Sequence, residues 1–219
     1  MLAPEDESKF DEVTYTYYEQ LNGYEHLKSL GIGYHFYQGP YTSAIGEVLD
    51  TDKKTILHIP SPNAGESTKD KYNEVGFIID SIGVTEKQDF DTGLIHVRRP
   101  DGKPIKVADL VNDDAKERER IVETLRNVKD ADDVDLIIAL GMAKEGFDWV
   151  WCEHALTIGY RSSLTEIVQI IGRATRDAEG KTRTRFTNLI AEPDATGEAV
   201  ADAVNDTLNA ISANPLTRL

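Results

Sequence analysis

The sequence from Val134 to Arg176 reads VDLIIALGMAKEGFDWVWCEHALTIGYRSSLTEIVQIIGRATR. It holds an apolar run, a turn that ends in Gly146-Phe147-Asp148, a second apolar run and a helical pattern. Val134–Leu140 is almost continuously apolar, which is typical of a strand buried on both faces of a parallel sheet. Ala155–Ile158 is predicted to be the next strand. These two strands predict the centre of a folded domain.

The last part of this stretch predicts a helix with one buried face and one polar face. Ser163-Leu164-Thr165-Glu166 matches the capping box that marks a helix start. Gln169, Arg173 and Arg176 fall within about 60° of one another on the polar face. An amide and two guanidinium groups suit a polyanion, most simply a nucleotide phosphate. Four apolar residues follow the i, i+3, i+4, i+7 spacing of the buried face: Leu164, Ile167, Val168 and Ile171.

Strands alternate with amphipathic helices through the rest of the chain. This order predicts an α/β domain with a mostly parallel sheet and helices on both faces. Ligands of such sheets collect at the carboxyl ends of the strands, so we expect the Gly141–Asp148 turn at that edge. The other predicted strands are Lys54–Ile59, Gly93–Arg98, Ile105–Val111 and Arg185–Ala191, and the other predicted helices are Asp70–Ile82, Asp114–Val128 and a final one around Val200–Ile211.

The ends of the chain differ in composition from its centre. Residues 1–50 are acidic and rich in tyrosine, and we expect them to form a lead-in segment with short helices at Tyr24–Leu30 and Ser43–Leu49. Residues 51–192 are predicted to form the α/β domain, and residues 193–219 a C-terminal helix and tail.

Composition restricts the class of protein. The chain is 40% hydrophobic and 29% charged, which predicts a soluble domain with a real core. Its N-terminus lacks the layout of a signal peptide, and its single cysteine fits a reducing compartment, so we expect a cytoplasmic protein without a membrane partner. The net charge of −15 argues against a surface covered in nucleic-acid contacts. Basic residues nevertheless outnumber acidic ones, six to three, between Thr157 and Ile190.

Two segments of the quoted stretch resemble helicase motifs. Ala139–Asp148 (ALGMAKEGFD) resembles motif V of superfamily 2 helicases and translocases, and Gln169–Arg176 (QIIGRATR) resembles motif VI, Q-x-x-G-R-x-x-R. His58-Ile59-Pro60 stands where motif IV would lie. Together, over about residues 50–192, the chain resembles the C-terminal RecA-like domain of DEAD/DEAH-box helicases, including the motors of restriction enzymes. The resemblance implies a RecA-like three-layer fold.

The resemblance also implies roles at an ATP site. Arg173 and Arg176 match the arginines that reach the ATP phosphates, the second being the arginine finger, whose charge stabilises the transferred phosphoryl group. Gln169 and Gly172 match positions that organise the same cleft. Gly146 and Asp148 match the motif V pair that couples nucleotide to nucleic acid.

Further implications concern partners. Gly141, His58 and Ser61 are the candidate contacts to DNA or RNA. ATP and Mg²⁺ would be bound mainly by an N-terminal RecA-like domain joined in cis, against which this domain would close. No residue pattern predicts a metal site within the chain itself.

Departures from the family pattern leave other interpretations open. Leu140 stands where motif V often carries Thr, so its side chain cannot hydrogen-bond to a nucleic-acid phosphate. Gly180-Lys181-Thr182 imitates the end of a Walker A loop, but it follows a helix and lacks the first glycine, so we reject it as a phosphate loop. The chain also has no Asp-Glu box, and alone it would be half of a motor.

Two competing functions follow from these departures. The chain could be a non-catalytic RecA-like module that binds other proteins, or a small-molecule enzyme that uses the Gly141–Gly146 turn as a phosphate nest. For Cys152 a core position and for His154 a position at a strand edge are favoured over a metal site, because no second pair of ligands lies at zinc spacing. Trp149 and Trp151, beside a buried strand, are interpreted as packing residues.

Overall fold

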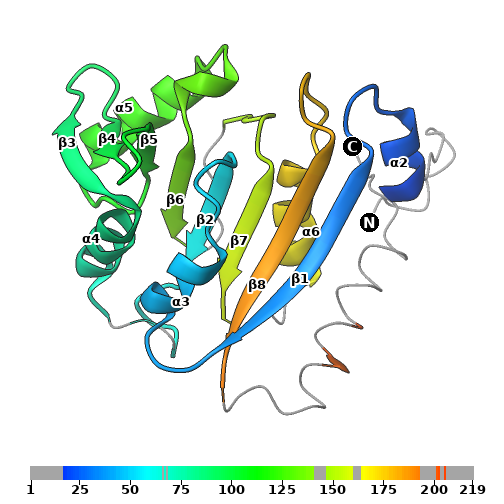
Figure 1. The fold of residues 1–219 in the computed structure, drawn as a ribbon, viewed down its shortest axis with the longest axis horizontal. Helices are drawn as coiled ribbons and strands as arrows, with labels where there is room; N and C mark the ends of the chain where they lie inside the picture. The colour runs from blue at the N-terminus through cyan, green and yellow to red at the C-terminus, as the bar shows by residue number, and fades with distance from the viewer. Residues whose placement is uncertain are drawn as a thin grey trace, which may run out of the picture.

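The computed structural model describes residues 17–65, 67, 69–140, 147–159, 164–192, 201–202 and 205. An eight-stranded sheet crosses the molecule in the order β1-β8-β7-β2-β6-β5-β4-β3 (Figure 1). The strands are β1 (Ser29–Tyr37), β2 (Thr55–Ile59), β3 (Val84–Gln88), β4 (Ile95–Arg98), β5 (Pro104–Asp109), β6 (Leu136–Leu140), β7 (His154–Ile158) and β8 (Arg183–Ala191). The helices are α2 (Tyr17–Gly23), α3 (Tyr41–Val48), α4 (Lys71–Ile82), α5 (Ala115–Arg126), the 3-10 turn η1 (Ala131–Asp133) and α6 (Leu164–Ala174).

Most of the sheet is parallel. The run from β1 to β5 in the spatial order pairs parallel at each step, whereas β4 pairs antiparallel with both β5 and β3. The predicted α/β domain with a mostly parallel sheet is therefore confirmed.

The two faces of the sheet carry separate apolar cores. Consecutive residues of a strand point to opposite faces, and in β2 Ile56 packs in the cluster shared with α5 and α6, whereas Leu57 packs in the cluster shared with α3 and α4. The same alternation occurs in β6, where Ile137 and Ile138 are divided between the two clusters. Figure 1 shows α3 and α6 on opposite sides of the sheet. The result is three layers.

Aspartate caps fix where two helices begin. Asp70 accepts a hydrogen bond from the backbone N–H of Asn73 at the start of α4. Asp114 accepts from the backbone N–H groups of Lys116 and Glu117 at the start of α5. Such side chains satisfy N–H groups that have no partner in the helix. Both helices start one residue after the boundary predicted from sequence.

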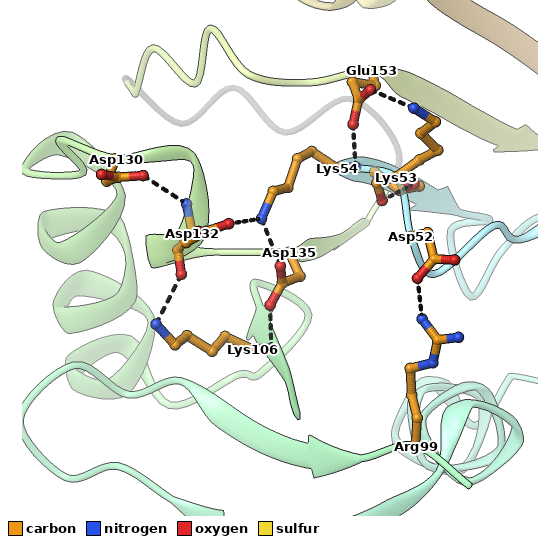
Figure 2. A network of polar contacts seen from close by, with 10 residues as sticks. Asp52, Lys53, Lys54, Arg99, Lys106, Asp130, Asp132, Asp135 and Glu153 are labelled. Atoms are coloured by element: carbon orange, nitrogen blue, oxygen red, sulfur yellow. Dashed lines mark hydrogen bonds and ion pairs between the residues drawn. The ribbon is translucent and has the colours of Figure 1, made fainter. Parts of the chain in front are cut away.

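A polar network ties strands together at the amino edge of the sheet, where the parallel strands begin (Figure 2). Lys54, just before β2, lies 2.7 Å from Asp135 and 3.2 Å from Asp132. Asp135, just before β6, also accepts from the backbone N–H of Lys106 on β5, at 2.8 Å. Glu153 accepts from the Lys54 backbone N–H, at 3.1 Å. The network thus fixes the starts of β2, β5 and β6 relative to one another.

The N-terminal part of the sheet differs from the sequence prediction. The prediction of a helix at Tyr24–Leu30 is wrong. Residues Ser29–Tyr37 form the strand β1, which pairs parallel with β8 over its whole length. The short helix expected at Ser43–Leu49 is confirmed as α3. Residues expected to form a lead-in segment therefore supply an edge strand and a helix to the α/β unit.

Two further regions bear on the predicted elements. The strand β3 was not expected, and each of its residues is exposed. Of the predicted final helix, only residues 201, 202 and 205 are described, and they are helical. Within the described part of the chain, no helix combines the length and the apolar character needed to span a bilayer.

Candidate functional site

Helix α6 carries the candidate motif VI residues. Ile167, Val168 and Ile171 are buried, as the apolar spacing predicted. Gln169 is exposed on the opposite side, and Gly172 is partly buried. Burial of the stripe on the sheet orients the polar face outward, so the helix presents Gln169 to solvent.

Arg176 follows the end of α6 and forms an ion pair with Asp148. Its Nη1 lies 2.9 Å from Asp148 Oδ2. The Arg176 side chain is 50% exposed and that of Asp148 is 57% exposed. Water competes strongly for such groups, so an exposed pair contributes only about 0.2–1 kcal/mol. The pair orients Arg176 and can be broken at low cost.

Arg173 contacts Phe147, the residue that precedes Asp148. Its guanidinium carbon lies 5.9 Å from the centre of the Phe147 ring, within the range of a cation–π contact. The consecutive residues Phe147 and Asp148 thus each contact one of the two candidate arginines. The structure brings the end of motif V and the end of motif VI together, although the sequence separates them by more than twenty residues.

The position of this cluster differs from the expected one. The Gly141–Asp148 turn was expected at the carboxyl edge of the sheet, but Asp148 meets Arg176 at the C-terminal end of α6, beside the amino edge. Two contacts establish this. Asp177 binds residues that lead into β1, and Glu153, which precedes β7, accepts from the backbone N–H of Arg185 in β8. The reason is that α6 returns antiparallel to the strands and carries its last turn back to where they start.

The candidate nucleic-acid contacts lie elsewhere. Ser61 is exposed in the loop after β2, at the carboxyl edge. His58 is only 1% exposed within β2, so its ring is not on the surface. Leu140, at the end of β6, is partly buried. Gly141 and Gly146 lie outside the described residues, so their roles stay predictions.

Asp177 is a functional candidate that the sequence did not indicate. Its carboxylate accepts from the backbone N–H groups of Glu25, His26 and Leu27, at 2.8, 3.1 and 2.7 Å. Burial by itself would raise the pKa of Asp177, but these three donors outweigh it and lower the pKa. The residue next to Arg176 is therefore fastened to the segment that enters β1.

The residues between the two motifs are mostly structural. His154 is buried and its Nε2 lies 2.9 Å from the hydroxyl of Thr187, and burial lowers its pKa to about 4. Cys152 is buried, and burial raises the pKa of its thiol to about 11. Trp149 is 3% exposed and packs in the core. The burial of Cys152 and Trp149 agrees with the core packing favoured from the sequence, and His154, expected at a strand edge, is the buried first residue of β7.

The chemistry of the donor set fits one side of an ATP site. Two guanidinium groups and an amide can bind phosphate oxygens. Within the described residues, no group of three or more His, Cys, Asp or Glu side chains could hold a metal ion. Lys181 of the rejected Walker-like motif is 3% exposed, and its ammonium donates to backbone carbonyls. The described site can therefore contribute positive charge to phosphates, but it does not contain a phosphate loop.

Comparison with known proteins gives similarity along nearly the whole chain. No protein-family model matches the sequence. The curated protein "Putative ATP-dependent helicase YeeB" of Bacillus subtilis (strain 168) is 67% identical over 217 residues, which cover 99% of this chain and 36% of that protein. The chain thus spans about a third of the length of the curated relative, and the resemblance to helicases found in the motifs is confirmed by this similarity.

One solved structure, of low sequence identity, agrees in fold. The ATP-dependent Type ISP restriction-modification enzyme LlaBIII bound to DNA matches 96% of this chain with 14% identity and a TM-score of 0.50, over 16% of its own chain. The DEAD-box protein SrmB of E. coli, bound to regulator of ribonuclease activity A, matches 81% of this chain and 84% of its own, with 12% identity and a TM-score of 0.48. At 14% identity the likeness to LlaBIII concerns the fold alone. The RecA-like three-layer arrangement is confirmed.

Proposed function

We propose that this chain is the second RecA-like half of an ATP-dependent helicase or translocase motor of superfamily 2. The observation that carries the proposal is the cluster at the end of α6, where Phe147 contacts Arg173 and Asp148 pairs with Arg176. Two arginines are thereby held together at the surface by residues that match motif V. The similarity to a curated helicase supports the same assignment.

In this proposal the arginines act on ATP bound to another domain. An N-terminal RecA-like domain in cis would supply the phosphate loop and the carboxylate that holds Mg²⁺. When the domains close, Arg176 would leave Asp148 and contact the phosphates. Negative charge on the transferred phosphoryl group is stabilised by such a guanidinium. Because the Asp148–Arg176 pair is exposed and weak, replacing Asp148 by a phosphate oxygen costs little free energy.

Gln169 and Arg173 are assigned supporting roles in the same cleft. Gln169 is exposed on the outward face of α6, where its amide can bind a phosphate or a group of the partner domain. Nucleic acid is assigned to the carboxyl edge of the sheet, where Ser61 is exposed. Nucleotide and nucleic acid would then meet opposite ends of α6, and closure of the domains would couple them.

The test is ATP hydrolysis by the full-length protein that contains this chain. Arg176→Ala is expected to lower kcat by about 10³-fold or more, with ATP affinity largely unchanged, because an arginine finger acts in the transition state. Arg126→Ala is the matched control, since Arg126 is likewise an exposed arginine close to the C-terminal end of a helix, in its case α5. Turnover retained by the Arg176 variant would refute the proposal. So would ordinary ATP turnover by the 219-residue chain alone.

A further inference from the structure

Lys181 is a buried cation that the proposed site does not yet use. It follows the turn after α6 and is only 3% exposed. Its ammonium donates one hydrogen bond to the backbone carbonyl of Arg176, at 2.8 Å, and one to the backbone carbonyl of Val150, at 2.9 Å. Val150 lies two residues after Asp148, so a single side chain connects the backbones on both sides of the Arg176–Asp148 pair.

This arrangement is not explained by a gain in stability alone. Transfer of an ammonium from water into a protein interior is unfavourable unless a carboxylate compensates it. The carboxylates of Glu153 and Asp177 act on Lys181 only through longer-range electrostatics, together with the Cys152 thiol. Burial is the dominant influence and lowers the pKa of Lys181 to about 8.

Lys54 is a structural lysine of the same domain with which Lys181 can be compared. Burial by itself would lower its pKa, but hydrogen bonds and charge interactions with Asp135 and Asp132 outweigh burial and raise it. Its ammonium is paired with both carboxylates. Lys181 lacks such compensation, and titratable groups with perturbed pKa values concentrate at functional sites.

We infer that Lys181 is a positioning residue, which fixes the backbone of Arg176 relative to the Phe147–Val150 segment and so places the guanidinium for phosphoryl transfer. The inference rests on the proposed function of Arg176. Lys181 itself does not contact ATP, because its ammonium is enclosed and both of its hydrogen bonds go to carbonyls of this domain.

The test measures kcat, the KM for ATP and the melting temperature of the full-length protein. Lys181→Met is expected to lower kcat by about 10- to 100-fold, because a small displacement of a catalytic group has an effect of this size. The KM for ATP is expected to stay within about twofold, because the change acts on the transition state. Lys54→Met is the matched control: it removes a largely buried lysine at the same sheet edge and should reduce stability without lowering kcat of the folded protein.

A double variant separates positioning from a general structural role. Because Lys181 acts through Arg176, Lys181→Met should lower kcat much less in an Arg176→Lys background than in the wild type. Equal effects in both backgrounds would overturn the inference. A wild-type kcat in Lys181→Met would also overturn it. If Lys181→Met does not fold, Lys181→Arg takes its place, because the guanidinium keeps donors for both carbonyls. A folded Lys181→Arg variant with kcat as low as that of Arg176→Ala would contradict positioning by those hydrogen bonds.

The failure of the inference can be told apart from the failure of the proposed function. If Arg176→Ala retains turnover, the arginine-finger assignment fails, whatever Lys181→Met does. If Arg176→Ala abolishes turnover and Lys181→Met does not lower it, only the role of Lys181 fails.

Discussion

Asp148 Oδ2 lies 2.9 Å from Nη1 of Arg176, and each side chain is about half exposed. The candidate arginine finger is therefore already paired within its own domain. In the proposed motor, Asp148 holds the guanidinium until ATP bound to the other domain competes for it. Phosphate oxygens can displace the Asp148 carboxylate because the Asp148–Arg176 pair is exposed to water and therefore weak.

Removal of the Asp148 charge should have little effect on folding. Asp148→Asn is expected to change the free energy of unfolding by less than about 1 kcal/mol, because an exposed ion pair contributes no more than that. Urea denaturation at low and high salt measures the effect, and the difference between variant and wild type should shrink as salt screens the pair. Glu86→Gln, which breaks the exposed Arg98–Glu86 pair at 2.5 Å, is the control. A loss several times larger would show that Asp148 has a structural role beyond this pair.

Loss of Asp177 should loosen the entry to β1. Asp177→Ala is expected to reduce the free energy of unfolding by about 1–2 kcal/mol, because the N–H groups of residues 25–27 lose their shared acceptor. Hydrogen exchange should increase first at those amides. Glu179→Ala, an exposed acid two residues away, should leave exchange there unchanged.

The same carboxylate gives a pH dependence with a definite sign. The pKa of Asp177 is lower in the folded state than its usual value of 3.8. The stabilisation is therefore present above the unfolded-state pKa and is lost as the pH falls through the lower folded-state value. Asp177→Asn should lose less stability than the wild type on acidification through that range. An identical acid response in both proteins would contradict the assignment.

His154 should make the protein sensitive to mild acid. Burial, followed by the charge of Arg185, lowers its pKa from 6.5 to about 4. Between these values the unfolded chain binds a proton that the folded chain does not, so stability falls as the pH drops through this window. Each unit of pKa difference corresponds to about 1.4 kcal/mol. Denaturation at neutral pH and at about pH 5 measures how much unfolding free energy is lost on acidification, and the loss should be smaller in His154→Gln than in the wild type. His96→Gln leaves His154 in place and serves as the control.

Lys181 should produce a pH dependence of the same sign as that of His154, but in the alkaline range. Its pKa is lowered from 10.5 to about 8, so the unfolded chain binds more protons than the folded chain between these values. Stability attributable to this residue therefore rises as the pH increases from about 8 to 10.5. Urea titrations across that range should show wild type gaining stability relative to Lys181→Met. A constant difference between the two proteins would mean that the ammonium is not desolvated as the structure indicates.

Elements with a strong apolar pattern could be predicted from the sequence. Val134–Leu140 and Lys54–Ile59 are rich in apolar residues because β6 and β2 lie in the middle of the sheet, with helices over both faces. The edges gave weaker signals. β3 is exposed throughout and has no buried side to leave a period in the sequence, and Gly31 and Gly33 interrupt the apolar pattern of β1.

The candidate site could be predicted only in part. Gln169, Arg173 and Arg176 were found because helical periodicity places them together, and the motifs supplied Asp148. No local pattern could reveal Lys181 or Asp177, because their functions depend on backbone groups distant in sequence: Val150 for Lys181, and residues 25–27 for Asp177. Nor could it reveal that the arginines lie beside the amino edge, since that follows from the direction in which α6 returns.

The pairing of β1 with β8 joins one of the earliest strands of the chain to the last strand described, in register from Ser29 with Arg183 to Tyr37 with Ala191. During synthesis β1 emerges well before β8, its neighbour among the described strands, and must wait until nearly the whole domain has been made. A fragment that began at residue 51 would lack this strand and leave the backbone of β8 open along one side. Open strand edges recruit other chains. Such a fragment should therefore aggregate on expression, and the shortest well-behaved version of this domain should begin ahead of residues 25–27, which Asp177 holds in place.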